Sequence, residues 1–247
     1  MTTLTGMSAV SAEGLTKRYG ARRGVQDVSF TVGAGQVCAL LGRNGAGKTT
    51  TMRLLVGLSR SDRGHARLLG QPVSLAAGVL ARVGVMIDGP GFVPHLSGLS
   101  NLKLLWRSAG RDWPPPALER SLALAGLGQA IDRKVKSYSM GMRQRLMLVQ
   151  ALMGAPDVVV MDEPGNGLDP AELRALREHL AAMAGAGAAI LISSHLLAEV
   201  ELLASHVVVL DDGAVRASGS LDELTAGQAG RLEDVFLDLT GSGDVSR

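Results

Sequence analysis

A glycine-rich segment at residues 42–49 has the residue types needed to hold a triphosphate. It matches the pattern G-x-x-x-x-G-K-T and lies between an apolar run and a segment with helical periodicity. Glycines let successive backbone N–H groups turn toward an anion at a helix N-terminus. A chance glycine-rich turn is the alternative, but the strand–loop–helix context favours nucleotide binding. The nucleotide-binding residues expected here are Gly42, Asn44, Gly45, Ala46, Gly47, Lys48, Thr49 and Thr50.

Specific chemistry follows for two of these side chains and for a second motif further along the chain. Lys48 would reach the β- and γ-phosphates, and the Thr49 hydroxyl would bind Mg²⁺. The apolar run at 158–161 ends in two carboxylates, Asp162 and Glu163. Asp162 would hold Mg²⁺ and Glu163 would polarise the attacking water. Two acids at a strand end can also be an ordinary loop start, but the phosphate loop favours the catalytic interpretation.

The elements that must position these groups alternate between short β-branched runs and helical patterns, which predicts an α/β fold with parallel strands. Lys48 and Asp162 are 114 residues apart, far more than one βαβ crossover requires, so an inserted lobe is expected. The stretch 93–155 has helical patterns and no convincing strand. Antiparallel edge strands are predicted at 9–16 and 25–32. Further strands are predicted at 36–41, 158–161, 188–193 and 206–210, with a hairpin turn at 211–213.

Composition limits the function classes. The chain has 247 residues, 46% hydrophobic and 19% charged, which is typical of a folded globular protein. A net charge of +2 and 3% aromatic residues give no case for nucleic acid as a partner. Cys38 is the only cysteine, which rules out an internal disulfide, and a buried structural thiol is expected. The apolar runs are shorter than a membrane span, so any membrane work is assigned to another polypeptide.

The segment YSMGMRQRL at residues 138–146 resembles the signature motif of the ATP-binding subunits of ABC transporters. In that family the serine and glycine, here Ser139 and Gly141, bind the γ-phosphate of ATP held by another subunit. Simple N-capping of a helix by Ser139 is the alternative. The two flanking motifs, in the order that the family shows, favour the signature interpretation.

Three further positions match this family in order. Residues 167–170 resemble the D-loop, whose Asp169 would lie at a dimer interface. His195 ends a strand where the family carries its switch histidine, which would contact the γ-phosphate and position the water. Tyr19 matches the aromatic residue that stacks on adenine, although a packed edge tyrosine is the alternative. The expected catalytic residues are therefore Lys48, Glu163 and His195.

The resemblance extends from Glu13 to the end and is strongest to exporters of the antibiotic and drug resistance type, similar to the daunorubicin and bacitracin exporters. It implies a P-loop NTPase core at 8–92 and 156–222, with a parallel sheet and an antiparallel edge subdomain. A helical signature subdomain is expected at 93–155 and a short tail at 223–247. The implied cofactors are ATP and Mg²⁺. The implied partners are a separate multi-span permease and a second ATP-binding subunit in a homodimer, placing the chain in the cytoplasm on the inner face of the membrane.

One position departs from the family. The loop that joins core and helical lobe usually carries glutamine, which touches Mg²⁺ and the water, whereas alignment on Val83-Gly84 and Pro90-Gly91 places Asp88 there. Aspartate can still accept a metal contact, directly or through water, so Asp88 is a predicted metal residue. The alternative is that Asp88 caps a turn.

Two rival functions keep the same motifs: a soluble ABC ATPase acting on ribosomes or DNA, and a regulatory module without transport.

Overall fold

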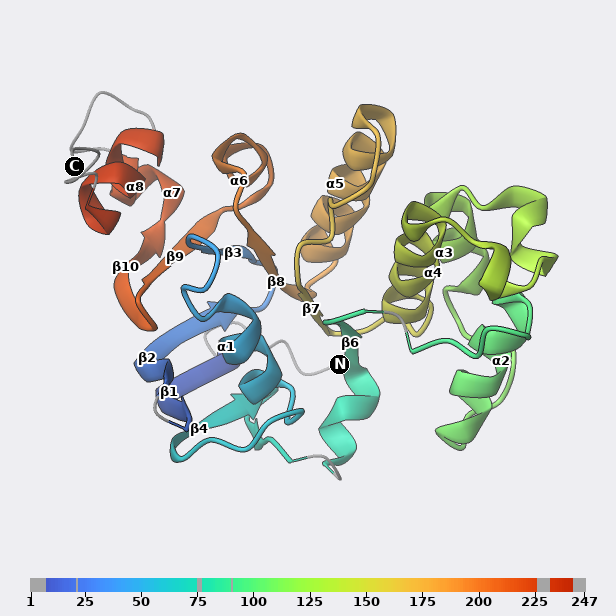
Figure 1. The fold of residues 1–247 in the computed structure, drawn as a ribbon, viewed down its shortest axis with the longest axis horizontal. Coiled ribbons are helices and arrows are strands. Elements are labelled where there is room, and N and C mark those ends of the chain that lie inside the picture. The colour runs from blue at the N-terminus through green and yellow to red at the C-terminus, as the bar shows by residue number, and fades with distance from the viewer. Residues whose placement is uncertain (1–7, 21, 75–76, 90, 226–231, 242–247) are drawn as a thin grey trace.

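The computed structural model describes residues 8–20, 22–74, 77–89, 91–225 and 232–241 of the chain (Figure 1). Its main sheet has six strands in the order β10-β9-β3-β8-β7-β6. The strands from β9 to β6 pair in parallel, and β10 is antiparallel to β9. Their bounds are β3 Val37–Leu41, β6 Val83–Met86, β7 Val158–Met161, β8 Ala189–Ser194, β9 His206–Asp211 and β10 Ala214–Ser220.

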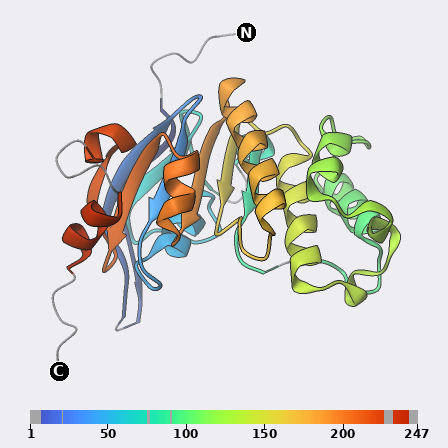
Figure 2. The same ribbon diagram turned by 90° about the horizontal axis from the view of Figure 1, so that it is seen from above.

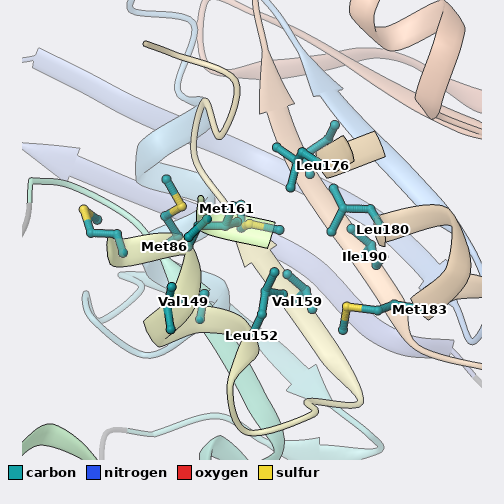
Figure 3. Close-up of a cluster of buried hydrophobic side chains, with 14 of the residues drawn as sticks. Met86, Val149, Leu152, Val159, Met161, Leu176, Leu180, Met183 and Ile190 are labelled. Carbon is teal, nitrogen blue, oxygen red and sulfur yellow. The ribbon is translucent and has the colours of Figure 1, made fainter. Parts of the chain in front are cut away.

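The central strands β3, β7 and β8 are buried along their whole length, and they are apolar except for Ser193 and Ser194 at the end of β8, because helices and the second sheet cover both faces. One core lies between this sheet and the helices α4 (Met140–Leu152) and α5 (Pro170–Gly185). Figure 3 shows Leu152 of α4 beside Val159 of β7, and Leu180 of α5 beside Ile190 of β8. The opposite face packs on α1 (Lys48–Leu55) and the second sheet, and it contains Cys38. Burial raises the pKa of the Cys38 thiol to about 12, which agrees with the expected structural role.

The predicted strands 9–16 and 25–32 belong to a second, four-stranded antiparallel sheet, which is the expected antiparallel subdomain. They are β1 (Ser8–Tyr19) and β2 (Arg22–Gly33), which pair antiparallel, and the strand order is β2-β1-β4-β5. The strands β4 (Arg63–Leu68), β5 (Gln71–Pro72) and β6 were not predicted. In β4 only Ala66 and Leu68 are buried. Because most of its other residues are polar, the alternation of apolar and polar residues that is typical of a strand is weak.

Residues 93–155, all of which the structure describes, contain helices and no strand, as predicted. The helices α2 (Gly98–Ser108), α3 (Leu118–Ala125) and α4 gather at one end of the molecule, away from β1 and β2 (Figures 1 and 2). Short 3₁₀ turns join them, and an isolated bridge connects Ser97 and Lys134. The exact limits of this lobe as a subdomain stay a prediction.

The C-terminal part returns to the main sheet. The predicted turn at 211–213 joins β9 to β10, with Asp212 and Gly213 both at positive φ, as a two-residue hairpin requires. The helices α6 (Leu197–Leu203), α7 (Leu221–Thr225) and α8 (Leu232–Thr240) follow the strands, and Leu232 of α8 is fully buried. Residues 226–231 and 242–247 of the expected tail lie outside the described residues. No helix that the described residues form is both long enough and apolar enough to cross a bilayer.

Candidate nucleotide site

The phosphate loop runs from the end of β3 to the first turn of α1. Gly47, just before the helix, has φ +104°, and a Cβ there would lie 2.6 Å from the Val25 side chain. Only glycine therefore fits at this position. Lys48 is buried at 7% exposure, and its Nζ donates to the Gly42 carbonyl at 2.7 Å. The ammonium group is thus held over the loop by backbone oxygen atoms.

The carboxyl end of β7 brings Asp162 to the first turn of α1. The Thr49 hydroxyl donates to Asp162 Oδ2 at 2.5 Å, and the Ser193 hydroxyl, at the end of β8, donates to Asp162 Oδ1. Two of the three residues that the sequence assigned to Mg²⁺ are therefore in direct contact, through Thr49 Oγ1 and Asp162 Oδ2. Oxygen donors of this kind are what Mg²⁺ prefers, and it normally takes only one or two protein carboxylates.

Glu163 is held between the phosphate loop and the histidine after β8. Its Oε1 lies 3.6 Å from Lys48 Nζ, and its Oε2 lies 2.7 Å from His195 Nδ1. Its backbone N–H donates to the Ser193 hydroxyl at 2.8 Å. Glu163 also has φ +50°, a conformation that non-glycine residues adopt rarely and mostly at functional sites. The carboxylate is thus directed between a lysine and a histidine.

These groups border an open cavity of about 470 Å³. Tyr19, with 46% of its surface exposed, lines it together with Lys48, Thr49, Asp162 and Glu163. Such an arrangement leaves an aromatic face for a base and a cation for phosphates. Nine predicted residues line the cavity, namely Tyr19, Asn44, Gly45, Gly47, Lys48, Thr49, Thr50, Asp162 and Glu163, and it adds Gly24 and Arg43, which were not predicted as site residues.

The other predicted residues lie outside this lining. Ala46 is buried, and its carbonyl accepts a hydrogen bond from Gly213 N. Ser139 is exposed and caps α4 by accepting from Met142 N at 3.2 Å. Asp169 caps α5 in a capping box with Glu172. Within one copy, Ser139 therefore does what its structural alternative expected, Asp169 also caps a helix, and Gly141 is not in the cavity either.

The signature segment nevertheless connects to the cavity through its own helix. Gln144 on α4 donates to the Glu163 carbonyl at 3.4 Å. A Cβ on Gly141 would lie 3.1 Å from the Gly167 carbonyl, so the signature and the D-loop are in close backbone approach. Arg145 Nη1 pairs with Glu172 Oε1 at 2.7 Å and joins α4 to the start of α5. The contacts of Gln144 and Arg145 were not foreseen from the sequence.

Asp88, predicted as a metal residue, does not line the cavity. Its carboxylate forms a two-point ion pair with Arg53 of α1, through Arg53 Nε at 2.9 Å and a second contact from Nη2. Asp88 has φ +66°, and its carboxylate raises the pKa of Arg53 above the usual value. The loop after β6 is thus tied to the helix that carries Lys48 and Thr49.

Comparisons with known proteins show which families and structures resemble this chain. A family model described as "ABC transporter" matches residues 25–166. A bacitracin transport ATP-binding protein of Enterococcus faecalis is 36% identical over 217 residues, which cover 87% of this chain and 70% of that protein. A daunorubicin/doxorubicin resistance ATP-binding protein of Streptomyces peucetius is 38% identical over 220 residues, covering 87% and 66%. A solved structure described as an ATP binding subunit of an ABC transporter is 30% identical, superposes with a TM-score of 0.84, and covers 94% of this chain and 99% of its own.

Proposed function

The chain belongs to the ABC transporter family as one of its ATP-binding proteins and is an ATPase, and from that premise we propose that it energises export through a separate membrane permease. Support comes from the relatives, whose names describe bacitracin transport and drug resistance. The cargo that we propose is therefore a drug, an antibiotic or a lipid-like molecule. The observation that carries the enzymatic part is Glu163, held between Lys48 and His195 at the edge of the cavity.

ATP would lie along this cavity with its base against Tyr19. Lys48 would leave its present carbonyl partner and bind the β- and γ-phosphates, since a cation neutralises the charge that develops there. The N-terminus of α1 and the glycine loop present backbone N–H groups to the same oxygen atoms. These residues bind and orient the triphosphate, and they act in the same way before and during its cleavage.

A divalent cation fits beside this position because Thr49 Oγ1 and Asp162 Oδ2 already lie together. We assign both as its protein ligands, and Mg²⁺ would neutralise charge between the β- and γ-phosphates when bound. Ser193 is a further residue of this site, because it accepts from Glu163 N and donates to Asp162. One hydroxyl thus holds the ligand carboxylate and the catalytic segment in a fixed relation.

Glu163 would polarise the attacking water with one carboxylate oxygen while His195 holds the other. Hydrolytic sites commonly hold the general base in place with a further side chain, because a fixed carboxylate is more often oriented correctly toward the water. The role of His195 in holding Glu163 rests on the contact at 2.7 Å between its Nδ1 and the carboxylate. By its resemblance to the switch histidine of the family, His195 would also contact the γ-phosphate.

A second copy would complete the site. Ser139 and Met140 are exposed at the N-terminus of α4, Met140 at 73%, while the cavity of the same copy is open. In a face-to-face homodimer, Ser139 and Gly141 of one copy would approach the γ-phosphate held by Lys48 of the other. Asp169 and the close contact between Gly141 and Gly167 would lie at the same interface. Loss of the γ-phosphate would remove this contact and let the copies separate.

The test is Glu163→Gln, which keeps the shape of the side chain but not its charge. We expect hydrolysis to fall about 100-fold or more while ATP still binds, so that ATP converts the protein to a dimer on size-exclusion chromatography. Glu178→Gln makes the same change at an exposed position of α5 and should behave as the wild type. A strict monomer with ATP would contradict the dimer, and unaltered turnover would contradict the role of Glu163. Co-purification of a multi-span protein in detergent tests the permease.

A further inference from the structure

A second glutamate lies close to the Glu163–His195 pair. Glu199 is on α6, four residues after His195, and its side chain is partly buried in a pocket between α5, α6 and the end of β8. The pocket is mostly apolar, with Leu173, Leu176, Ile192 and Leu203 in its lining. An acidic side chain in such surroundings is unfavourable unless it has polar partners. Its partners therefore indicate what it does.

The partners of Glu199 are two chain segments that lead to catalytic groups. The Ser194 hydroxyl donates to Glu199 Oε2 at 3.5 Å, and Ser194 directly precedes His195. On the other side, a Cβ added to Gly165 would lie 3.2 and 3.4 Å from the two Glu199 carboxylate oxygens. Gly165 is two residues after Glu163, on the loop that leads to Asp169. The Glu199 carboxyl group thus lies between the segment of His195 and the segment of Glu163.

The charges around Glu199 belong to the same site. Glu163 faces it from the end of β7, His195 from the end of β8 and Arg177 from α5. Burial, and then the charge of Glu163, raise the pKa of Glu199 above its usual value, while Ser194, His195 and Arg177 oppose that rise. The two glutamates therefore interact, and the carboxylate form of Glu199 adds negative charge next to the proposed base.

We propose that Glu199 is a positioning residue for ATP hydrolysis: its carboxyl group braces the loop at 164–168 against the segment 193–195, so that Glu163 and His195 stay aligned. This inference rests on the proposed roles of Glu163 and His195. It gives Glu199 two effects that can be separated. One is mechanical and depends on the side chain filling the space against Gly165, and the other is electrostatic and depends on its charge.

Glu199→Gln and Glu199→Ala separate these effects, with Glu201→Gln on the same helix as the matched control. Glu201 accepts from Leu232 N at 3.0 Å, a contact that glutamine can retain. For Glu199→Gln, which removes the charge but keeps the volume of the side chain, we expect kcat to stay within about twofold of the wild type. For Glu199→Ala we expect kcat to fall about 5- to 10-fold with KM for ATP within about twofold, as for a misaligned reacting group. Glu201→Gln should have the same kcat and KM as the wild type.

Gly165→Ala tests the mechanical effect from the other side. Its new methyl group would press on the Glu199 oxygens and on Leu173 Cδ1, so kcat should fall, and Glu199→Ala in the same chain should recover part of that loss. The proposal is overturned if Glu199→Ala keeps the kcat of the wild type, if Glu201→Gln lowers kcat as much as Glu199→Ala does, or if the Gly165 and Glu199 effects simply add. Failure of the wild type itself to hydrolyse ATP would instead overturn the proposed function, so the two failures are distinguishable.

Discussion

Two helix N-termini in this molecule carry anion-binding chemistry, but their surroundings differ. The first, at α1, is enclosed: Lys48 is buried, Thr49 contacts Asp162, and the loop faces a cavity of its own chain. The second, at α4, is open: Ser139 and Met140 face solvent, and the bonds of this helix run backward to Glu163 and Glu172. Under the proposed function, the first would bind ATP within one copy, whereas the second would supply groups to the ATP of a neighbouring copy. The proposed function therefore needs two copies to work together.

The largest effect is expected at the enclosed helix. Lys48→Ala removes the buried cation that would neutralise the phosphates, so hydrolysis should fall at least about 100-fold. ATP binding, followed with a fluorescent analogue, should weaken as well. Lys103→Ala removes a lysine from α2 and serves as the control. Retention of normal turnover in Lys48→Ala would show that the enclosed helix is not the phosphate site.

The open helix gives the sharper test, because its defect should be repaired in trans. Ser139→Glu places a negative charge where the γ-phosphate of the other copy would approach, so this variant alone should be inactive while still binding ATP. Mixed in equal amounts with Lys48→Ala, it should recover up to about a quarter of wild-type activity. Half of the dimers would be mixed, and each would contain one intact site.

Ser137→Glu is the control for that experiment, since Ser137 is also exposed and lies two residues earlier. It should keep its own activity. A mixture of Lys48→Ala and Ser139→Glu with no activity above the separate variants would mean that the two helices do not meet across an interface.

A smaller effect is expected at the loop after β6, which connects the main sheet to the helical lobe. Asp88→Ala breaks the ion pair with Arg53, and we expect ATP hydrolysis to fall several-fold because the loop loses its anchor on α1. Asp157→Ala breaks a similarly exposed pair, Arg82–Asp157, far from the cavity. Each pair should contribute no more than about 1 kcal/mol to the free energy of unfolding. If Asp88→Ala left both ATPase rate and transport unchanged, the predicted role of Asp88 would be wrong.

The sequence predicted most of the residues around the N-terminus of α1, but few of the contacts that connect the elements of the site to one another. Lys48, Asp162, Glu163 and His195 could be expected together because each follows a strand, and the carboxyl ends of β3, β7 and β8 share one edge of a parallel sheet. The family resemblance and the fold class are confirmed by the comparisons. The roles assigned to the site residues stay predictions.

The contacts that no pattern announced are tertiary. Ser193 looks like part of a strand end, and its bridge from Asp162 to Glu163 exists only because β7 and β8 are neighbours. Arg53 sits on an ordinary amphipathic helix, and nothing in its local sequence indicates that Asp88 will approach it. The strands β4 and β6 were missed because a mostly polar strand and a four-residue strand have weak periodicity.

The smallest predicted effect lies where α3 of the helical lobe packs on α5, at His179. Its Nε2 is buried without a hydrogen-bond partner among the described residues. Burial, and then the charge of Arg120, lower the pKa of His179 below its usual value of 6.5. The unfolded chain therefore takes up a proton more readily than the folded chain. Stability should be unaffected by this group well above pH 6.5 and should decrease as the pH falls through that value.

His179→Gln removes the titrating group from this junction. Thermal unfolding at pH 7.5 and pH 5.5 should show a smaller loss of melting temperature on acidification for the variant than for the wild type. His65→Gln is the matched control, because His65 is exposed on β4, where it pairs with Glu13. Equal losses for the wild type and His179→Gln would show that His179 does not contribute to the loss of stability at acid pH. A smaller loss for the variant would show that protonation of His179, on the helix that α3 contacts, destabilises the folded chain.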